Sequence, residues 1–438
     1  MGFASQVLAA TAATEGSFDR FSRHLDPVWV AEALAATGHG TLRRRRLPAE
    51  QIVWLVIGMG LLRDRPITEV VRHLDLALPT RNSVGVASSS ITEGRQRVGF
   101  KPLEWLFVRS ASEWGHRSAE RYRWRGLAVY GVDGTTLRLP DSDENRDHFG
   151  GQRGNRGDSG YPQMRLVVLM ALRARVLAAA SFGPYDSELR YAAELWPSVP
   201  NESLTIVDRG FLSANILMPL EAGGINRHWL TRAKSSSSWR VLKQLGPGDA
   251  WVEFTVSDHA QKQNDDLPKT WIVRAIDYQR DGHDKQVLLT SLTDAERYPA
   301  GEIVELYHER WELELGYDEI KTELLEREET IRSKSPEAVA QEMCGTLIAY
   351  NLVRLEMERI ADELEVPPNR ISFVAALRFI RDEWHWSWIT ESPGAIPRHI
   401  ADMREKIRRF LLPPRRSERT YPRSVKIKMS NYTRKRRS

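Results

Sequence analysis

The sequence predicts an α/β fold, in which a mixed sheet flanked by helices is interrupted by an all-β insertion. An all-helical N-terminal domain should precede this core, and further helices and a basic tail should follow it. Three observations predict this fold: helical signals up to about residue 118, strands alternating with helices after residue 125, and successive strand-like segments after residue 226. With 438 residues, the chain is too long for one typical core.

We therefore divide the chain into five segments by the change of pattern along it. They are an N-terminal helical DNA-binding domain (1–118), the first part of the core (119–225), the all-β insertion (226–298), the second part of the core (299–390) and a C-terminal basic segment (391–438).

The N-terminal segment carries repeated helix-start and helix-stop signals. Pro27, Pro48 and Pro66 each stand near the start of an apolar-periodic stretch, and proline is favoured in the first helical turn. Gly38 ends the first stretch, and Gly99 breaks a later one into two helices. These signals predict a compact helical domain.

Basic residues cluster in three places. The run Arg43–Arg46 and the pair Arg95 and Arg97 lie in the helical segment, and residues 415–438 carry ten basic residues and one acid. Such clusters attract phosphates by releasing counterions, so they suit DNA contact. Ordinary charged helix surfaces and a solubilising tail are the alternative interpretation.

The core pattern begins with "RGLAVYGVDGTTLRLP" (125–140), a strand that should end at a turn at Asp133 and Gly134. "ESLTIVDRGF" is a short buried strand that ends at Asp208, and a helix closed by Gly223 follows it. After residue 226, four strand-like segments are separated by turn-rich stretches, which predicts the all-β insertion. Pro299 then opens a long helix.

The long helix concentrates its functional residues on one narrow strip. At about 100° per residue, Arg310, Glu314 and Lys321 fall beside Tyr307. The apolar stripe that must be buried is formed by Leu306, Leu313, Tyr317, Ile320 and Leu324. The acids on the opposite face, where we expect solvent, are Glu302, Glu305, Glu309, Glu312, Glu319 and Glu323. Glu314 is therefore separated from nearly all other acids of its helix.

Three acids on different elements stand out: Asp133, Asp208 and Glu314. Acids at strand ends collect at one edge of an α/β sheet, although a single strand-end aspartate is more often a turn former. Three carboxylates together repel one another and need divalent cations; oxygen ligands select Mg²⁺ or Mn²⁺. Two such ions can activate a hydroxyl or water against a phosphodiester and stabilise the leaving oxygen. Arg310 and Lys321 would suit a backbone phosphate.

The spacing Tyr307, Arg310, Glu314 and Lys321 resembles the Tyr-Arg-Glu-Lys signature of insertion-sequence transposases with an RNase H-like DDE core. The sequence is most similar to the subgroup named for insertion sequence four. "VDGTT" and "VDRGF" resemble the contexts of the first and second catalytic aspartates, and the helix after the signature and the N-terminal helices also resemble the subgroup. The resemblance covers roughly residues 25 to 380.

The resemblance implies cut-and-paste transposition, in which element ends are hydrolysed and joined to target DNA. It implies that Asp133, Asp208 and Glu314 hold two Mg²⁺ ions, with Mn²⁺ as a substitute, and that Tyr307, Arg310 and Lys321 bind DNA. Partners would be the terminal inverted repeats and target DNA, and a homodimer is expected because two ends must be joined. Some relatives form a hairpin with a base flipped by a tryptophan; no tryptophan spacing here matches, and core packing is expected for those of the insertion.

Two alternatives stay open from the sequence: an RNase H-like nuclease without strand transfer, and a non-catalytic DNA-binding protein descended from a transposase. The chain retains all three acids, which disfavours the second alternative. A P-loop, a kinase motif and a zinc motif are each missing from the sequence.

The remaining composition fits a protein of the cytoplasm. The single cysteine, Cys344, excludes an internal disulfide and should be buried in a helix. The sequence starts without a signal peptide, and its strongest apolar run (52–62) is too short to span a bilayer. We expect a soluble, nucleoid-associated protein.

Overall fold

The computed structural model describes residues 25–39, 47–74, 86–151, 153–154, 157–158, 160–279, 284–326, 331–386 and 403–413. The basic run Arg43–Arg46 and the basic tail 415–438 lie outside these residues. None of the helices in the described part of the chain has the length and apolar character needed to cross a membrane.

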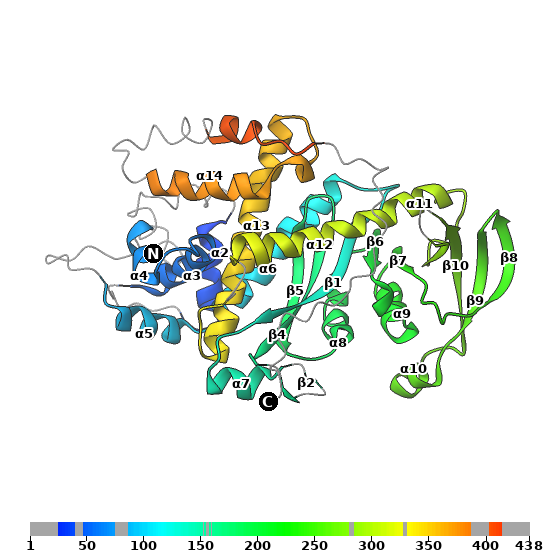
Figure 1. Ribbon diagram of the computed structural model, residues 1–438, viewed down its shortest axis with the longest axis horizontal. Helices are drawn as coiled ribbons and strands as arrows, with labels where there is room; N and C mark the ends of the chain where they lie inside the picture. Colours follow the sequence, from blue (N-terminus) through cyan, green and yellow to red (C-terminus); the bar gives the residue numbers. More distant parts are fainter. Residues whose placement is uncertain are drawn as a thin grey trace, which may run out of the picture.

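The N-terminal region is helical, as predicted (Figure 1). Its helices are α2 (Pro27–Ala36), α3 (Ala49–Leu61), α4 (Ile67–His73), α5 (Ser88–Val98) and α6 (Lys101–Arg121). Asp26 caps α2, because its Oδ1 accepts a hydrogen bond from the Val28 amide at 2.9 Å. Gly99 separates α5 from α6 with a φ of 64°, in the left-handed region that favours glycine.

A mixed sheet forms the centre of the molecule. In the described chain its strand order is β5-β4-β1-β6-β7-β11-β10-β9-β8. The strands are β1 (Ala128–Arg138), β4 (Gln163–Ala171), β5 (Val176–Pro184), β6 (Ser203–Val207), β7 (Arg227–Arg232), β8 (Arg240–Gly246), β9 (Asp249–Thr255), β10 (Thr270–Tyr278) and β11 (Gln286–Thr290). The pairs β1–β6 and β6–β7 are parallel, and the other pairs are antiparallel. A separate small hairpin consists of β2 (Arg153–Gly154) and β3 (Gly157–Asp158).

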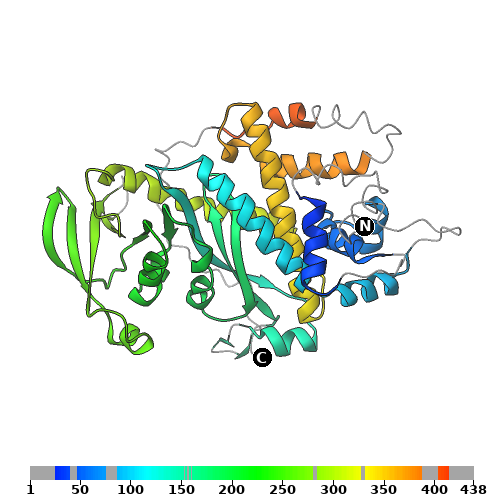
Figure 2. The same ribbon diagram turned by 180° about the vertical axis from the view of Figure 1, so that it is seen from behind.

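Helices cover both faces of this sheet (Figures 1 and 2). On one face lie the helical segment predicted from Pro299 and α13 (Pro336–Glu363), and α14 (Phe373–Trp386) packs against α13. On the other face lie α8 (Glu188–Ala193) and α9 (Ala214–Ala222). The remaining short helices are α7 (Asp143–Phe149), α10 (Asp258–Gln263), η2 (Trp196–Ser198), η3 (Arg209–Phe211) and η6 (Pro368–Arg370).

The region 226–298 is not the all-β insertion that the sequence predicted. Strand β7 pairs in parallel with β6 and so belongs to the central sheet, and β11, β10, β9 and β8 extend that same sheet. The region also contains helix α10, in a stretch that we expected to be a turn because of its composition. The Ser257 hydroxyl accepts a hydrogen bond from the Ala260 amide and thereby caps this helix. Two tryptophans of this region, Trp229 and Trp271, are buried against each other, with ring centroids 4.9 Å apart.

The long helix after Pro299 changes its winding along its length. It consists of α11 (Ala300–Tyr307), a 3₁₀ turn η4 (His308–Arg310), α12 (Trp311–Asp318) and a π-helical turn η5 (Glu319–Leu324). The predicted apolar stripe is buried: the relative exposure of Leu306, Leu313, Tyr317, Ile320 and Leu324 is 7% or less. A uniform rotation of 100° per residue therefore predicts the buried stripe correctly. It predicts the exposure of the acids only in part.

Two acids expected in solvent are buried instead, namely Glu312 and Glu319. Arg175, between β4 and β5, donates hydrogen bonds from Nε to Glu312 at 2.5 Å and from Nη1 to Glu319. From α13, Tyr350 donates its hydroxyl to Glu319 at 2.9 Å, and Arg354 lies 3.4 Å from the same carboxylate. The helix is covered on two sides, by the sheet and by α13, and these buried cations make the charges tolerable.

Helices α3 and α13 cross in direct backbone contact. A Cβ on Gly345 would lie 2.7 Å from the Val56 carbonyl oxygen, and a Cβ on Gly60 would lie 3.0 Å from the Thr346 Cα. Glycine is required at both positions for this close approach. Arg95 of α5, which we expected to contact DNA, points inward to α13 and donates to Gln341 at 2.8 Å and to the Ala338 carbonyl. Cys344 is buried here, as predicted.

Candidate active site

Asp133 and Asp208 lie next to each other on parallel strands. In the β1–β6 register, Val132 is opposite Val207, and the two aspartates follow these residues directly. Neighbouring strands are about 4.8 Å apart, so the two side chains leave the sheet in adjacent positions. The sheet topology therefore brings together two of the three acids that the sequence singled out.

The prediction that β1 ends at Asp133 is wrong. The strand continues to Arg138, with Asp133 paired to Val168 and Gly134 to Val167 of β4. Only the pairing with β6 stops at Val132. At Asp133, β1 is therefore still paired with β4 but no longer with β6, because the chain of β6 turns away after Asp208 into the 3₁₀ turn η3.

Helix α12 is anchored across this part of β1. The Tyr317 hydroxyl donates a hydrogen bond to the Asp133 carbonyl oxygen. Leu313 covers Gly131, where an added Cβ would lie 2.7 Å from the leucine Cδ1. Glu314 follows Leu313 on this helix, so its carboxylate is carried next to the strand that bears Asp133.

Arg310 lies among the three acids. Its Nη2 donates to Glu314 Oε1 at 2.8 Å, and the side-chain exposures are 16% for the arginine and 38% for the glutamate. Burial lowers the pKa of Arg310, but Tyr307, Glu314 and Asp208 outweigh that effect and raise it. The same guanidinium opposes the rise in the Asp133 pKa described below. Arg310 therefore bonds Glu314 and carries a positive charge that also acts on the two aspartates.

Tyr307 and Lys321 complete the predicted strip at its two ends. Tyr307 is buried, and burial raises the pKa of its phenol to about 12, so the hydroxyl stays protonated at neutral pH. Lys321 is partly buried, and its Nζ lies 3.2 Å from the Thr135 hydroxyl of β1. Burial and the nearby Arg138 lower the Lys321 pKa.

Asp133 has a perturbed pKa and a neighbour that the sequence did not reveal. Burial raises its pKa to about 6, with smaller contributions from Glu188 and Asp208, against the Gly134 amide and Arg310. Glu188 begins α8, and an added Cβ on Gly134 would lie 2.7 Å from its Cγ. Nothing in the spacing of "DSELR" marks this glutamate, because the packing of α8 on β1 places it beside Gly134, where it also pairs with Arg165 and its charge acts on Asp133.

The described residues contain no group of three histidine, cysteine, aspartate or glutamate side chains close enough to hold a metal ion. Asp133 and Asp208 fit an oxygen-preferring divalent cation, because they are adjacent and partly shielded from solvent. The third donor, Glu314, lies on the neighbouring helix but is engaged with Arg310. The three carboxylates are thus suitable ligands for a divalent cation, but one of them, Glu314, is paired with Arg310.

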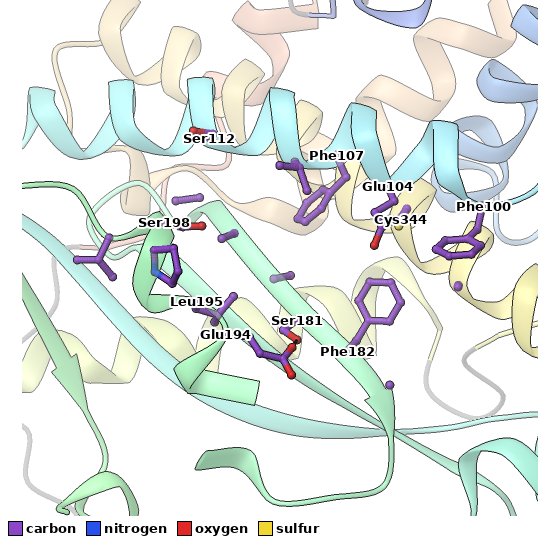
Figure 3. A pocket seen from close by; sticks show the side chains of 18 of the residues that line it. Phe100, Glu104, Phe107, Ser112, Ser181, Phe182, Glu194, Leu195, Ser198 and Cys344 are labelled. Atoms are coloured by element: carbon purple, nitrogen blue, oxygen red, sulfur yellow. Dashed lines mark hydrogen bonds between the residues drawn. The ribbon is translucent and has the colours of Figure 1, made fainter. Parts of the chain in front are cut away.

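A separate cavity of about 1140 Å³ lies between α6 and the edge strand β5 (Figure 3). Its lining includes Phe107, Phe182, Glu194 and Cys344, and none of the six predicted site residues. It is distinct from the cluster around Asp133.

Comparisons with known proteins identify the family of this chain. A family model described as the insertion element 4 transposase N-terminal region matches residues 15–108, and one described as the transposase DDE domain matches residues 124–352. Transposase InsG for insertion sequence element IS4 of Escherichia coli K12 is 37% identical over 411 residues, or 93% of this chain and 92% of InsG. The putative transposase InsZ of the same strain is 38% identical over 219 residues, or 49% and 71%.

Among solved structures, piggyBac transposase in a synaptic complex with hairpin DNA aligns over 93% of this chain and 87% of that chain, with a TM-score of 0.44 and 12% identity. Taken with the mixed sheet and its helices, the matched DDE domain defines an enzyme of the DDE transposase class. The chain belongs to the insertion-sequence-four family of these transposases.

Proposed function

We propose that this transposase cuts the ends of its own insertion sequence and joins them to target DNA by metal-dependent phosphoryl transfer. The observation that carries this proposal is the adjacency of Asp133 and Asp208 on parallel strands, with the helix of Glu314 anchored across the same strand. Three carboxylates on three elements that meet at one edge suit divalent cations better than any other ligand.

In this proposal Asp133, Asp208 and Glu314 hold two Mg²⁺ ions, for which Mn²⁺ would substitute. When bound, the ions would activate the attacking water or 3′-hydroxyl and stabilise the leaving oxygen. The protein's own contribution is to hold the acids on a rigid sheet. Burial of Asp133 disfavours its ionised form, so cation binding to this carboxylate would be accompanied by release of a proton below about pH 6.

The strip formed by Tyr307, Arg310 and Lys321 would bind the DNA backbone beside the cleaved bond. Arg310 offers a planar fork that matches two phosphate oxygens, and Lys321 offers a single positive charge. Tyr307, protonated at neutral pH, would donate its hydroxyl to a phosphate oxygen. These three groups lie on one helical segment, so they can contact consecutive parts of one DNA strand.

The partners we propose are double-stranded DNA at the terminal inverted repeats and at the target, and a second copy of this chain. Two element ends must be held together for strand transfer, which favours a homodimer on DNA. The helical segment 1–118 and the basic segment 391–438 would supply DNA contacts outside the active site. Residues 119–225 and 299–390, together with β7 of region 226–298, would form the catalytic core.

The direct test is Mg²⁺-dependent cleavage of a duplex that carries an element end with its flanking DNA. Asp133→Asn, Asp208→Asn and Glu314→Gln should each lower the cleavage rate more than about a hundredfold, because each removes a cation ligand. Asp318→Asn is the matched control, since Asp318 is an exposed acid of the same helix. Full activity of any of the three variants would refute the role of that residue.

Strand transfer needs its own measurement. A duplex already cut at the element boundary, incubated with supercoiled plasmid, should be joined to the plasmid by the wild type and not by the three variants. Cleavage without any joining would favour an RNase H-like nuclease instead.

A further inference from the structure

Glu314 is held away from the other two acids by the ion pair with Arg310. The two residues are four apart on the helical segment, and the Arg310 Nη2 to Glu314 Oε1 distance is 2.8 Å. Glu314 is the more exposed partner, at 38% against 16%. More than a third of the Glu314 side chain is therefore in contact with solvent, so its carboxylate is less confined by packing than the Arg310 guanidinium.

Arg310 has two sets of acidic neighbours. On its own segment it pairs with Glu314, and across the strand ends its charge acts on Asp208 and Asp133. Without DNA or metal, one guanidinium thus offsets the charge of an acid cluster. A phosphate that engages the planar fork bidentately would compete with Glu314 for the Nη2 donor, since Nη2 is the atom that bonds Glu314.

We propose that Arg310 exchanges Glu314 for a DNA phosphate, so that Glu314 joins Asp133 and Asp208 only when DNA is bound. The inference rests on the proposed function, in which Arg310 binds a backbone phosphate. A phosphate offers the fork two charged oxygens in the matching geometry, whereas a single i,i+4 carboxylate contact is a weak interaction. Once released, Glu314 needs only a side-chain rotation to face β1, because its helix is already anchored there.

The consequence is an order of assembly. In the absence of DNA the site has two free carboxylates and would bind a divalent cation weakly. The DNA end completes the ligand set by engaging Arg310, so full metal occupancy and the substrate arrive together. Arg310 is in this sense a positioning residue that acts through Glu314.

The first test measures Mn²⁺ binding to the full chain without DNA, by isothermal titration calorimetry. We expect Glu314→Gln to bind Mn²⁺ within about twofold of the wild type, because the glutamate is not yet a ligand. We expect Arg310→Gln to bind about tenfold more tightly, because it releases Glu314. The double variant, Arg310→Gln with Glu314→Gln, should return to the wild-type affinity.

Two results would overturn the inference. A large loss of DNA-free Mn²⁺ affinity in Glu314→Gln would show that the glutamate is already a ligand. A gain that persists in the double variant would show that Arg310 acts by its charge alone. Arg138→Gln serves as the control for charge, since it removes an exposed cation near the same end of β1.

The second test repeats the titration with a duplex that ends at the element boundary and so cannot be cut there. DNA should strengthen Mn²⁺ binding about tenfold in the wild type and much less in Glu314→Gln. If the chain binds no Mn²⁺ with or without DNA, both the proposed function and this inference fail. If cleavage depends on the three acids but Mn²⁺ affinity ignores DNA, only the inference fails.

Discussion

The buried ion cluster around Arg175 should be a main determinant of stability, and Arg175→Met tests it. Arg175 donates hydrogen bonds to both Glu312 and Glu319. The exposed fractions of the side chains are 6% for Arg175, 3% for Glu312 and 10% for Glu319. Methionine has a similar length and fills the space but removes the cation. Arg354 would still lie 3.4 Å from Glu319, so the loss falls mainly on Glu312, which no longer accepts the hydrogen bond from Arg175 Nε at 2.5 Å.

The magnitude follows from this geometry. Removing one partner of a buried ion pair costs about 3–5 kcal/mol, because an uncompensated charge stays inside the protein. The remaining contact of Arg354 places the expected loss near the lower end, at about 3 kcal/mol. With a denaturant slope near 3 kcal/mol per molar urea, the midpoint of unfolding should fall by about 1 M.

Equilibrium urea unfolding, followed by tryptophan fluorescence, measures this change. The matched control is Arg125→Met, which breaks an exposed pair with Glu302 and should leave the unfolding midpoint nearly unchanged. Adding Glu312→Leu to Arg175→Met should recover part of the loss, since it removes one of the two acids that Arg175 bonds. A midpoint for Arg175→Met equal to that of the wild type would refute the reasoning.

Three further predictions concern the strand that carries Asp133. Because the folded pKa of Asp133, about 6, lies above the ordinary 3.8, the free energy of unfolding should fall as pH rises from about 4 to 6. With a chelator present, Asp133→Asn should therefore be more stable than the wild type by about 2–3 kcal/mol at pH 7.5 and equally stable at pH 3.5. Urea midpoints of variant and wild type that are equal at both pH values would contradict this. Gly131→Ala should cost about 1–3 kcal/mol by thermal unfolding, because the new methyl meets Leu313 at 2.7 Å; an unchanged midpoint would mean that the helix moves freely over the strand. Tyr317→Phe should cost about 1 kcal/mol, since the buried hydrogen bond to the Asp133 carbonyl is lost, and a stabilising effect would argue against that bond.

Local signals predicted the helices well, because a cap or a break is written in adjacent residues. The Asp26 cap of α2 and the glycine break at Gly99 are examples. Helical periodicity also placed the buried stripe of the signature helix. That Asp133 and Asp208 lie close together was expected from their strand-end positions, although β1 in fact continues past Asp133 and the strand order itself was not predicted.

The features that the sequence did not predict depend on residues far apart in the chain. Glu312 and Glu319 are buried because arginines neutralise them. One of these, Arg175, lies more than 130 positions earlier in the chain, and the other, Arg354, lies on the following helix. The charge of Glu188 acts on the Asp133 pKa because α8 packs on β1. Arg95 bonds α13 inside the protein instead of lying on its surface. No periodicity of a single segment contains such information.

The backbone crossing at Gly60 and Gly345 restricts how this enzyme can be divided or recombined. A fragment that starts after α3 would leave the crossing glycine of α13 facing solvent and would expose the apolar residues around it. Engineers who wish to exchange the N-terminal helices between relatives should therefore transplant both sides of the crossing together. In evolution, too, α3 and α13 would have to change as a matched pair.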